Sequence, residues 1–251
     1  MFFPSGRDGR NGSIDGMRGV RIQEPVAGGL VIAGATGALG NEVVRRLVGQ
    51  FGVTHVLARR PMTAGLRGVS AAVVEGDDPA AWPPLPAATG IVLFDPPRLF
   101  HDRERALWTP APEQLPAVAQ WLRRSGAGTL AVVLPHAQGR LPEALKRGLA
   151  SLDEHAVAAL GFDRLLIVRS ARRPGPPAPA ALLPRIAHAM LASLKYMVPA
   201  SEQPVRAAKV ADFVSQALRV APPGIHVAAP ELVWRAAQGD TAGAVRQWLQ
   251  V

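Results

Sequence analysis

Short apolar runs alternate along the chain with stretches in which apolar residues recur every three or four positions. The runs predict strands at Leu30–Ala33, Val53–Ala58, Ala71–Val74, Ile91–Phe94, Leu130–Leu134, Leu165–Val168 and, near the end, Ile225–Ala228. Nearly continuous apolar runs are typical of strands that are buried on both faces of a parallel sheet.

The stretches between the runs have the period of amphipathic helices. They predict helices over Ala38–Gly49, Glu113–Arg124, Leu141–Leu160, Leu182–Tyr196 and Ala207–Leu218, and further helical segments beyond Glu231. Strands that alternate with helices form right-handed βαβ units. We therefore expect an α/β fold, a Rossmann-like doubly wound parallel sheet with a small C-terminal lobe.

Two segments fall outside this alternation. Residues 1–28 contain many Gly and Arg and no sustained apolar period, so we expect a flexible leader, in which Met17 is an alternative start. Residues 174–184, PGPPAPAALLP, are a proline-rich break. The prediction is one Rossmann domain over residues 29–251, with its C-terminal lobe beginning at about residue 174.

The first predicted strand leads directly into a glycine-rich turn, VIAGATGALG, and then into an amphipathic helix. In a nucleotide-binding turn of this kind, Gly34 permits the tight turn, Gly37 lets the backbone approach a pyrophosphate, and Gly40 lets the helix pack closely. The unpaired amides at the helix start would then face the phosphates. The alternative is a turn with a structural role only.

The second predicted strand ends in Arg59-Arg60-Pro61. Sites that select NAD usually carry an acidic residue here, which binds the ribose 2′-hydroxyl. A guanidinium instead pairs well with a 2′-phosphate. The residues favour NADP as the cofactor, with NAD still possible; the alternative is that both arginines are ordinary surface residues.

The order GATGALG, LARRP and VVEGDD resembles the atypical short-chain dehydrogenase/reductase superfamily, and within it the NAD(P)H-binding, NmrA-like group. The similarity continues through LDEHAVAALGFDRLLIVRSA, QPVRAAKVADFVSQAL and PGIHVAAPELV, so it spans roughly Leu30 to Val233. The resemblance implies that residues 36–39 line the pyrophosphate, Arg59 meets the 2′-phosphate and Asp77 lies near the adenine. Residues 94–96 would border the adenosine ribose and the path to the nicotinamide. Asp77 and Asp95 could equally be turn or cap residues.

The loop, the arginines and the resemblance together define one predicted cofactor-binding set. It consists of Gly34, Ala35, Thr36, Gly37, Ala38, Leu39, Gly40, Arg59, Arg60, Asp77, Phe94, Asp95 and Pro96.

The catalytic residues of that superfamily are not found at the matching positions. A reductase of this type uses a Tyr, a Lys four residues later, and a Ser or Thr after the fifth strand. Here Lys146 and Ala150, or Pro142 and Lys146 after a one-turn shift, stand in place of the Tyr–Lys pair. Leu134-Pro135 replaces the serines, and the only tyrosine, Tyr196, lies far downstream. The catalytic residues are therefore unknown, with His136 a candidate for proton transfer and Lys146 for holding the nicotinamide ribose.

The amino-acid composition limits the kinds of chemistry, location and partner that the protein can have. The absence of cysteine excludes disulfides and thiolate chemistry, and the six histidines show no metal-ligand spacing. No membrane span or signal peptide is predicted, so we expect a cytoplasmic protein. The net charge of +9 comes from scattered arginines, which favours a solvated basic surface over a nucleic-acid footprint.

The sequence thus predicts an NAD(P)-binding protein of the atypical short-chain dehydrogenase/reductase type that lacks the standard Tyr–Lys dyad. It would be an oxidoreductase with non-standard acid chemistry, or a redox-sensing or scaffold protein that binds NADP(H) and an unknown protein partner. A basic nucleic-acid-binding protein is the remaining alternative.

Overall fold

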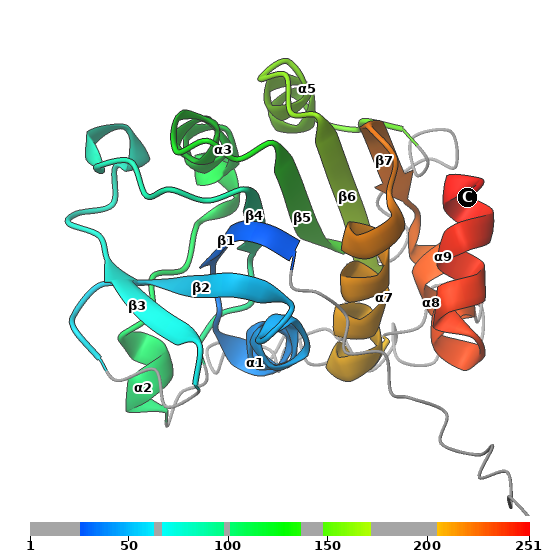
Figure 1. Cartoon of the computed structure of the whole chain (residues 1–251), viewed down its shortest axis with the longest axis horizontal. Coiled ribbons are helices and arrows are strands. Elements are labelled where there is room, and N and C mark those ends of the chain that lie inside the picture. The colour runs from blue at the N-terminus through cyan, green and yellow to red at the C-terminus, as the bar shows by residue number, and fades with distance from the viewer. Residues whose placement is uncertain (1–25, 63–66, 98–100, 137–147, 172–204) are drawn as a thin grey trace, which may run out of the picture.

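A computed structural model describes residues 26–62, 67–97, 101–136, 148–171 and 205–251 (Figure 1). Within these ranges seven parallel strands form one sheet in the order β3-β2-β1-β4-β5-β6-β7. The strands are β1 (Val26–Ala33), β2 (Phe51–Ala58), β3 (Val69–Val73), β4 (Thr89–Leu93), β5 (Thr129–His136), β6 (Arg164–Ala171) and β7 (Gly224–Ala228). This is a Rossmann-like α/β fold, as the alternating pattern predicts.

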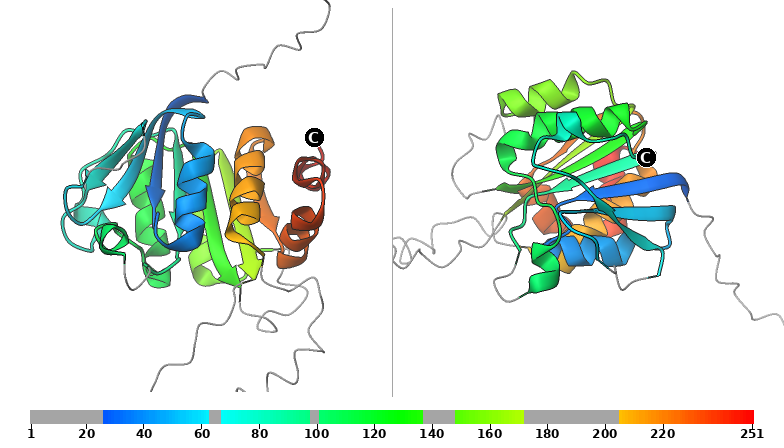
Figure 2. Two further views of the ribbon diagram at one scale, coloured as in Figure 1. Left: turned by 90° about the horizontal axis from the view of Figure 1, so that it is seen from below. Right: turned by 90° about the vertical axis from the view of Figure 1, so that its left-hand side faces the viewer.

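Helices cover both faces of the sheet (Figure 2). The α-helices are α1 (Gly37–Leu47), α2 (Asp102–Arg105), α3 (Leu115–Arg124), α5 (Leu152–Ala158), α7 (Ala207–Val220), α8 (Pro230–Gln238) and α9 (Thr241–Leu249), and two short 3₁₀ helices span Pro79–Ala81 and Pro112–Gln114. Buried residues of α1, α7, α8 and α9 share one core with the sheet, and those of α3 and α5 share the other. No helix in the described part of the chain is long and apolar enough to cross a bilayer.

Strand β1 explains why the apolar runs are continuous. Leu30 and Ile32 point into the core under α1 and α7, whereas Val31 and Ala33 point into the core under α3 and α5. All four side chains are completely buried. Since successive residues of a strand face opposite sides, a central strand between two helical layers has no polar face.

The predicted strands are all present, with ends that differ by a few residues. Strand β1 begins at Val26, inside the predicted leader, and the rest of that leader lies outside the described residues. The proline-rich break and the helix predicted at Leu182–Tyr196 also lie outside them. The C-terminal segment adds β7 to the same sheet, as predicted, and α7, α8 and α9 to one of its faces.

The continuous helix predicted over Leu141–Leu160 is wrong at its described end. Residues 148–150 are not helical, and α5 begins only at Leu152. Ser151 has an extended backbone and its hydroxyl accepts a hydrogen bond from the Glu154 amide, which is an N-terminal cap. The apolar period alone gave no sign of this cap.

A buried ion pair fastens the start of α5 to β6. The Arg169 Nη2 atom lies 2.6 Å from Glu154 Oε2, and the two side chains are only 2% and 5% exposed. Glu154 Oε2 also accepts a hydrogen bond from the Ala150 amide, and Arg169 donates to the Gly148 carbonyl. These bonds hold the non-helical residues before α5 in place.

We expect Glu154→Ala to lower the free energy of unfolding by roughly 3–5 kcal/mol, because it removes the carboxylate from a buried guanidinium. Urea unfolding of the full chain measures this. In the control, Glu42→Ala, the lost partner is the exposed Arg45, so the loss should stay below about 1 kcal/mol. Equal losses in the two variants would show that the buried pair has no special role.

Candidate functional site

The turn between β1 and α1 is built on very close backbone approaches. Gly34 has a φ of +80°, and a Cβ atom there would lie 2.0 Å from the Leu93 carbonyl oxygen of β4. A Cβ atom at Gly40 would lie 2.3 Å from the backbone carbon of Ala35. Only glycine fits at either position, and α1 therefore starts directly against the carboxyl ends of β1 and β4.

Two carboxylates of the chain itself bind amides at the start of α1. The Gly37 amide donates to Glu104 Oε2 at 3.1 Å, and the Leu39 amide donates to Asp95 Oδ2 at 3.3 Å. Glu104 is 5% exposed, and its Oε1 atom accepts from Asn41 Nδ2 at 2.9 Å. Anions are favoured at a helix N-terminus because its amides are unpaired and its dipole is positive there.

Asp95 follows β4 and lies directly against the turn. A Cβ atom at Gly37 would lie 3.0 Å from the Asp95 Cβ atom and 3.2 Å from the Pro96 carbonyl oxygen. The Thr36 hydroxyl donates a hydrogen bond to the Asp95 carbonyl. The space beside Gly37, which the sequence assigns to a pyrophosphate, is therefore filled by Asp95 and Pro96.

Residues 101–110, which we call the α2 segment, cross the carboxyl ends of β1 and β2. Leu107 bridges Ala58 of β2, and the amides of Arg59 and Gly34 donate to the carbonyls of Ala106 and Trp108 at 2.8 and 3.1 Å. The Trp108 amide donates to the Leu57 carbonyl at 2.9 Å. The segment is thus bonded by its backbone to both strands at the edge where Rossmann folds bind ligands.

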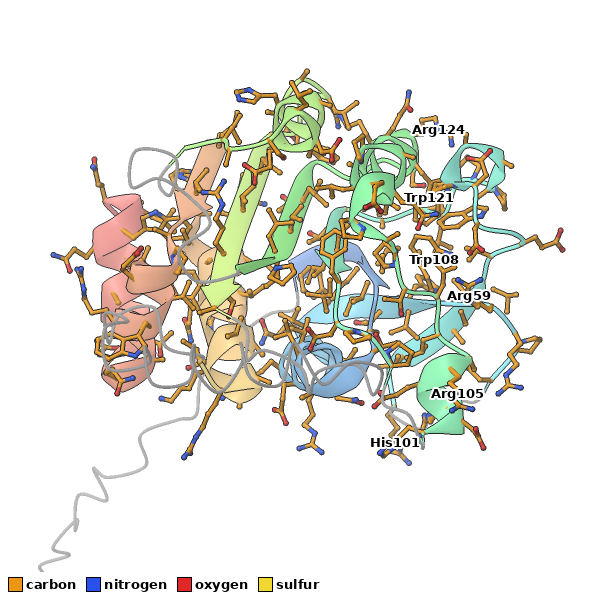
Figure 3. All side chains as sticks on the ribbon, turned by 180° about the vertical axis from the view of Figure 1, so that it is seen from behind. Arg59, His101, Arg105, Trp108, Trp121 and Arg124 are labelled. Atoms are coloured by element: carbon orange, nitrogen blue, oxygen red, sulfur yellow. The ribbon has the colours of Figure 1, made fainter. Side chains whose placement is uncertain are left out.

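The α2 segment also reaches Arg59 and Asp77. Asp77 Oδ1 lies 2.8 Å from Arg59 Nη1 and accepts a hydrogen bond from Trp108 Nε1 at 3.0 Å. Trp108 is fully buried and meets Trp82 edge to face, with ring centroids 4.7 Å apart. Figure 3 shows Trp121, Trp108 and Arg59 following one another along this side of the molecule.

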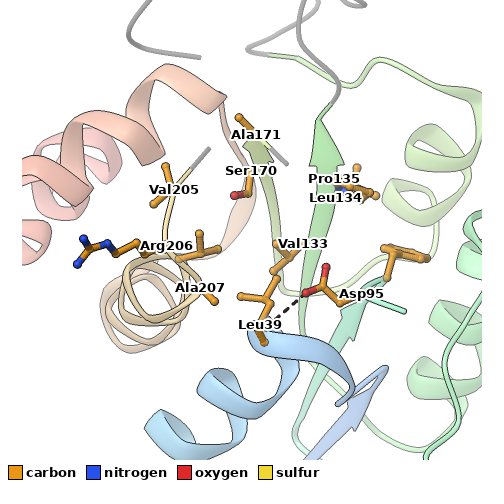
Figure 4. Close-up of a pocket in the computed structure, with 13 residues that line it drawn as sticks. Leu39, Asp95, Val133, Leu134, Pro135, Ser170, Ala171, Val205, Arg206 and Ala207 are labelled. Carbon is orange, nitrogen blue, oxygen red and sulfur yellow. Dashed lines mark hydrogen bonds between the residues drawn. The ribbon is translucent and has the colours of Figure 1, made fainter. Parts of the chain in front are cut away.

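A cavity of about 510 Å³ opens beside the turn (Figure 4). Its lining comes from the starts of α1 and α7 and the ends of β4, β5 and β6: Ala38, Leu39, Phe94, Asp95, Val133, Leu134, Pro135, Ser170, Ala171, Val205, Arg206, Ala207 and Val210. The lining is mostly apolar. Its polar groups include the Asp95 carboxylate and the Ser170 hydroxyl, whereas the Arg206 side chain is directed away from the cavity.

The structure separates the predicted cofactor-binding residues into two groups. Ala38, Leu39, Phe94 and Asp95 line the cavity. Arg59, Arg60 and Asp77 lie outside its lining, towards the α2 segment, where Arg60 Nη2 donates to the Asp102 carbonyl at 3.3 Å. Thr36 and Gly37 are buried in the turn itself.

The described part of the cavity contains no tyrosine, lysine or histidine. Leu134 and Pro135 line it at the positions where the resemblance places serines. His136 ends β5 opposite Ala171, but its side chain, like Lys146 and Tyr196, lies outside the described residues. The described residues also contain no group of three His, Asp or Glu side chains that could hold a metal ion.

Three residues of the site were missed by the sequence analysis. Ser170, which pairs with Pro135 across β5 and β6, provides a hydroxyl at the cavity. Glu104 and Trp108 belong to HDRERALW, in which no regular element was predicted. The one available signal was a tryptophan within a polar stretch, a residue that usually needs to be buried.

No protein-family model and no curated protein matches the chain. Among solved structures, WbmH of Bordetella bronchiseptica in complex with NAD⁺ is 12% identical, over 84% of this chain and 80% of that one, with a TM-score of 0.42. A variant of uronate dehydrogenase from Agrobacterium tumefaciens complexed with NAD is also 12% identical, over 80% and 76%, with a TM-score of 0.45.

The turn can be tested with two glycines that share a left-handed backbone. Gly49 has a φ of +83° with nothing within 4 Å of an added Cβ atom, so Gly49→Ala should lose about 1–2 kcal/mol of stability from strain alone. Gly34→Ala should lose roughly 1–3 kcal/mol more, because the methyl group meets β4. Thermal or urea unfolding measures both, and equal losses would contradict the close approach.

Proposed function

We propose that the chain binds a nicotinamide dinucleotide, with a preference for NADP(H), and belongs to the atypical short-chain dehydrogenase/reductase type. The observation that carries this proposal is the glycine turn of β1–α1, which opens on the 510 Å³ cavity. It lies where the strand order reverses, between β1 and β4. Open α/β sheets bind their ligands at this switch point, outside the carboxyl ends of the strands.

The residues present fit such a cofactor at the cavity, whereas at the turn Asp95 and Glu104 occupy the place of its phosphates. The turn offers amides to phosphates, and the mostly apolar cavity suits a nicotinamide ring. Asp95 and Glu104 hold those amides in the structure. Because two like charges about 4 Å apart repel by roughly 4 kcal/mol near a protein surface, phosphates and both carboxylates do not share the turn. Binding therefore displaces the carboxylates.

In the bound state, residues 36–39 would hold the pyrophosphate and Arg59 the 2′-phosphate. The Arg59–Asp77 pair is half exposed, with side-chain exposures of 48% and 60%. An exposed pair of this kind contributes about 0–1 kcal/mol, so the guanidinium can exchange Asp77 for a phosphate at little cost. Asp77 would then be available to the adenine.

The cofactor would supply or accept a hydride when bound. In the described part of the chain, the groups beside the cavity that could orient a substrate are the Ser170 hydroxyl and the Asp95 carboxylate. Because the sequence has Lys146 and Ala150 in place of the Tyr–Lys pair and Leu134-Pro135 in place of the serines, we infer that binding, in a redox-sensing or scaffold role with a protein partner, is the better-supported function. Standard carbonyl reduction has less support.

Calorimetric titration of NADPH and NADH into the full-length chain tests this proposal. Arg59→Ala should weaken NADPH binding by about 10- to 100-fold, since it removes a charge-assisted bond to the 2′-phosphate, and should change NADH binding less than about twofold. Arg45→Ala, an exposed arginine of α1, is the control and should change neither. Equal losses for the two dinucleotides in Arg59→Ala would refute the 2′-phosphate role.

A further inference from the structure

We propose that Asp95 and the α2 segment form a plug, which closes the nucleotide half of this site and is displaced when a dinucleotide binds. The inference rests on the proposed function and adds its regulation. The chain supplies its own anions and its own aromatic ring to the edge where the nucleotide would lie. The affinity of the protein for dinucleotides therefore depends on the free energy needed to move the plug away from the start of α1.

Glu104 is the central contact of the plug. Both of its carboxylate oxygens are bonded to α1, one to the Gly37 amide and the other to Asn41 Nδ2. A backbone N–H has one hydrogen to donate, so Gly37 cannot serve a phosphate oxygen while Glu104 remains in place. Glu104 lies 67 residues from Gly37 in the sequence, yet its carboxylate accepts a hydrogen bond from the Gly37 amide.

 The first turn of α1 contains no acidic residue of its own, so the negative charges at this helix start come from Glu104 and Asp95.

Asp95 closes the turn from the other side. Its carboxylate accepts from the Leu39 amide, and its carbonyl accepts from the Thr36 hydroxyl. Asp95 also lines the cavity, so it stands between the turn and the space that the rest of a dinucleotide would occupy. Two separate carboxylates therefore hold neighbouring amides that a pyrophosphate would need.

Trp108 extends the plug to the adenine side. Its indole N–H donates to Asp77, the residue that the resemblance assigns to the adenine, and its backbone bonds to β1 and β2. One continuous segment thus places an anion at the helix start and a flat bicyclic ring beside Asp77. Adenosine diphosphate offers the same two groups, an anion and a flat bicyclic ring.

The two ends of the plug differ in how firmly they are held. Around Glu104, the neighbouring residues His101, Asp102, Arg103 and Arg105 are all exposed, whereas Ala106 and Trp108 are buried. Helix α2 spans only Asp102–Arg105. Displacing α2 exposes little apolar surface, whereas displacing Trp108 exposes a large aromatic side chain. Opening therefore begins at Glu104.

The affinity test uses Glu104→Gln and Asp95→Asn, which keep the shapes of the side chains and remove one negative charge each. Each variant should bind NADPH at least about tenfold more tightly than the unaltered chain, because one repelling charge is gone. Glu42→Gln, which removes an exposed carboxylate from the same helix, should change affinity less than about twofold. Unchanged or weaker binding in both plug variants, with normal unfolding curves, would overturn the plug.

Hydrogen–deuterium exchange of the ligand-free chain gives a second readout. Glu104→Gln should speed exchange in peptides covering residues 101–110 and 34–41, and leave β5 and β6 unchanged, because the plug is held there by the lost charge. No change in those peptides would overturn the role of Glu104 in the plug.

The two proposals fail in different ways. If the unaltered chain and both plug variants bind NADPH equally well, the plug is wrong and the proposed function stands. If neither NADPH nor NADH binds to any of them, including a variant whose exchange shows the plug open, the proposed function is wrong and the plug's regulatory role falls with it.

Discussion

The first backbone amides of α1 have no partner within the helix, and the carboxyl edge of the sheet is arranged around them. The glycine turn brings these amides against the ends of β1 and β4, where the positive end of the helix dipole favours an anion. In the structure the anions are Asp95 and Glu104. Through those contacts Asp95 and α2 both lie against the start of α1.

The same contacts connect the two halves of the site. Asp95 belongs to both the turn and the cavity, and Trp108 joins the turn to Asp77 and Arg59. A ligand that replaces Glu104 at Gly37 would therefore act on a segment whose other end touches the proposed 2′-phosphate site. Binding of the phosphates and release of the Arg59–Asp77 pair are expected to be linked in this way.

The sequence was sufficient to predict the fold because its signals are local. Leu30 to Ala33 is an unbroken apolar run because β1 is covered on both faces, and the glycine spacing marks the turn. Glu104 could not be predicted, since Asp102, Arg103 and Arg105 beside it are exposed and nothing in the composition distinguishes it. Its partner at the helix start is Gly37, 67 residues away in the sequence. The cap at Ser151, which shortens α5, likewise depends on side-chain bonds that an apolar period does not record.

The central claim is that the start of α1 binds dinucleotide phosphates in place of the chain's own carboxylates. The most direct measurement is the amide resonances of Gly37 and Leu39 in ¹⁵N-labelled full-length protein during titration with NADPH. Both resonances should move and saturate together with those of residues 101–110, because the hydrogen-bond acceptor of each amide changes. Saturable binding of NADPH that leaves the Gly37 and Leu39 resonances in place would contradict the account.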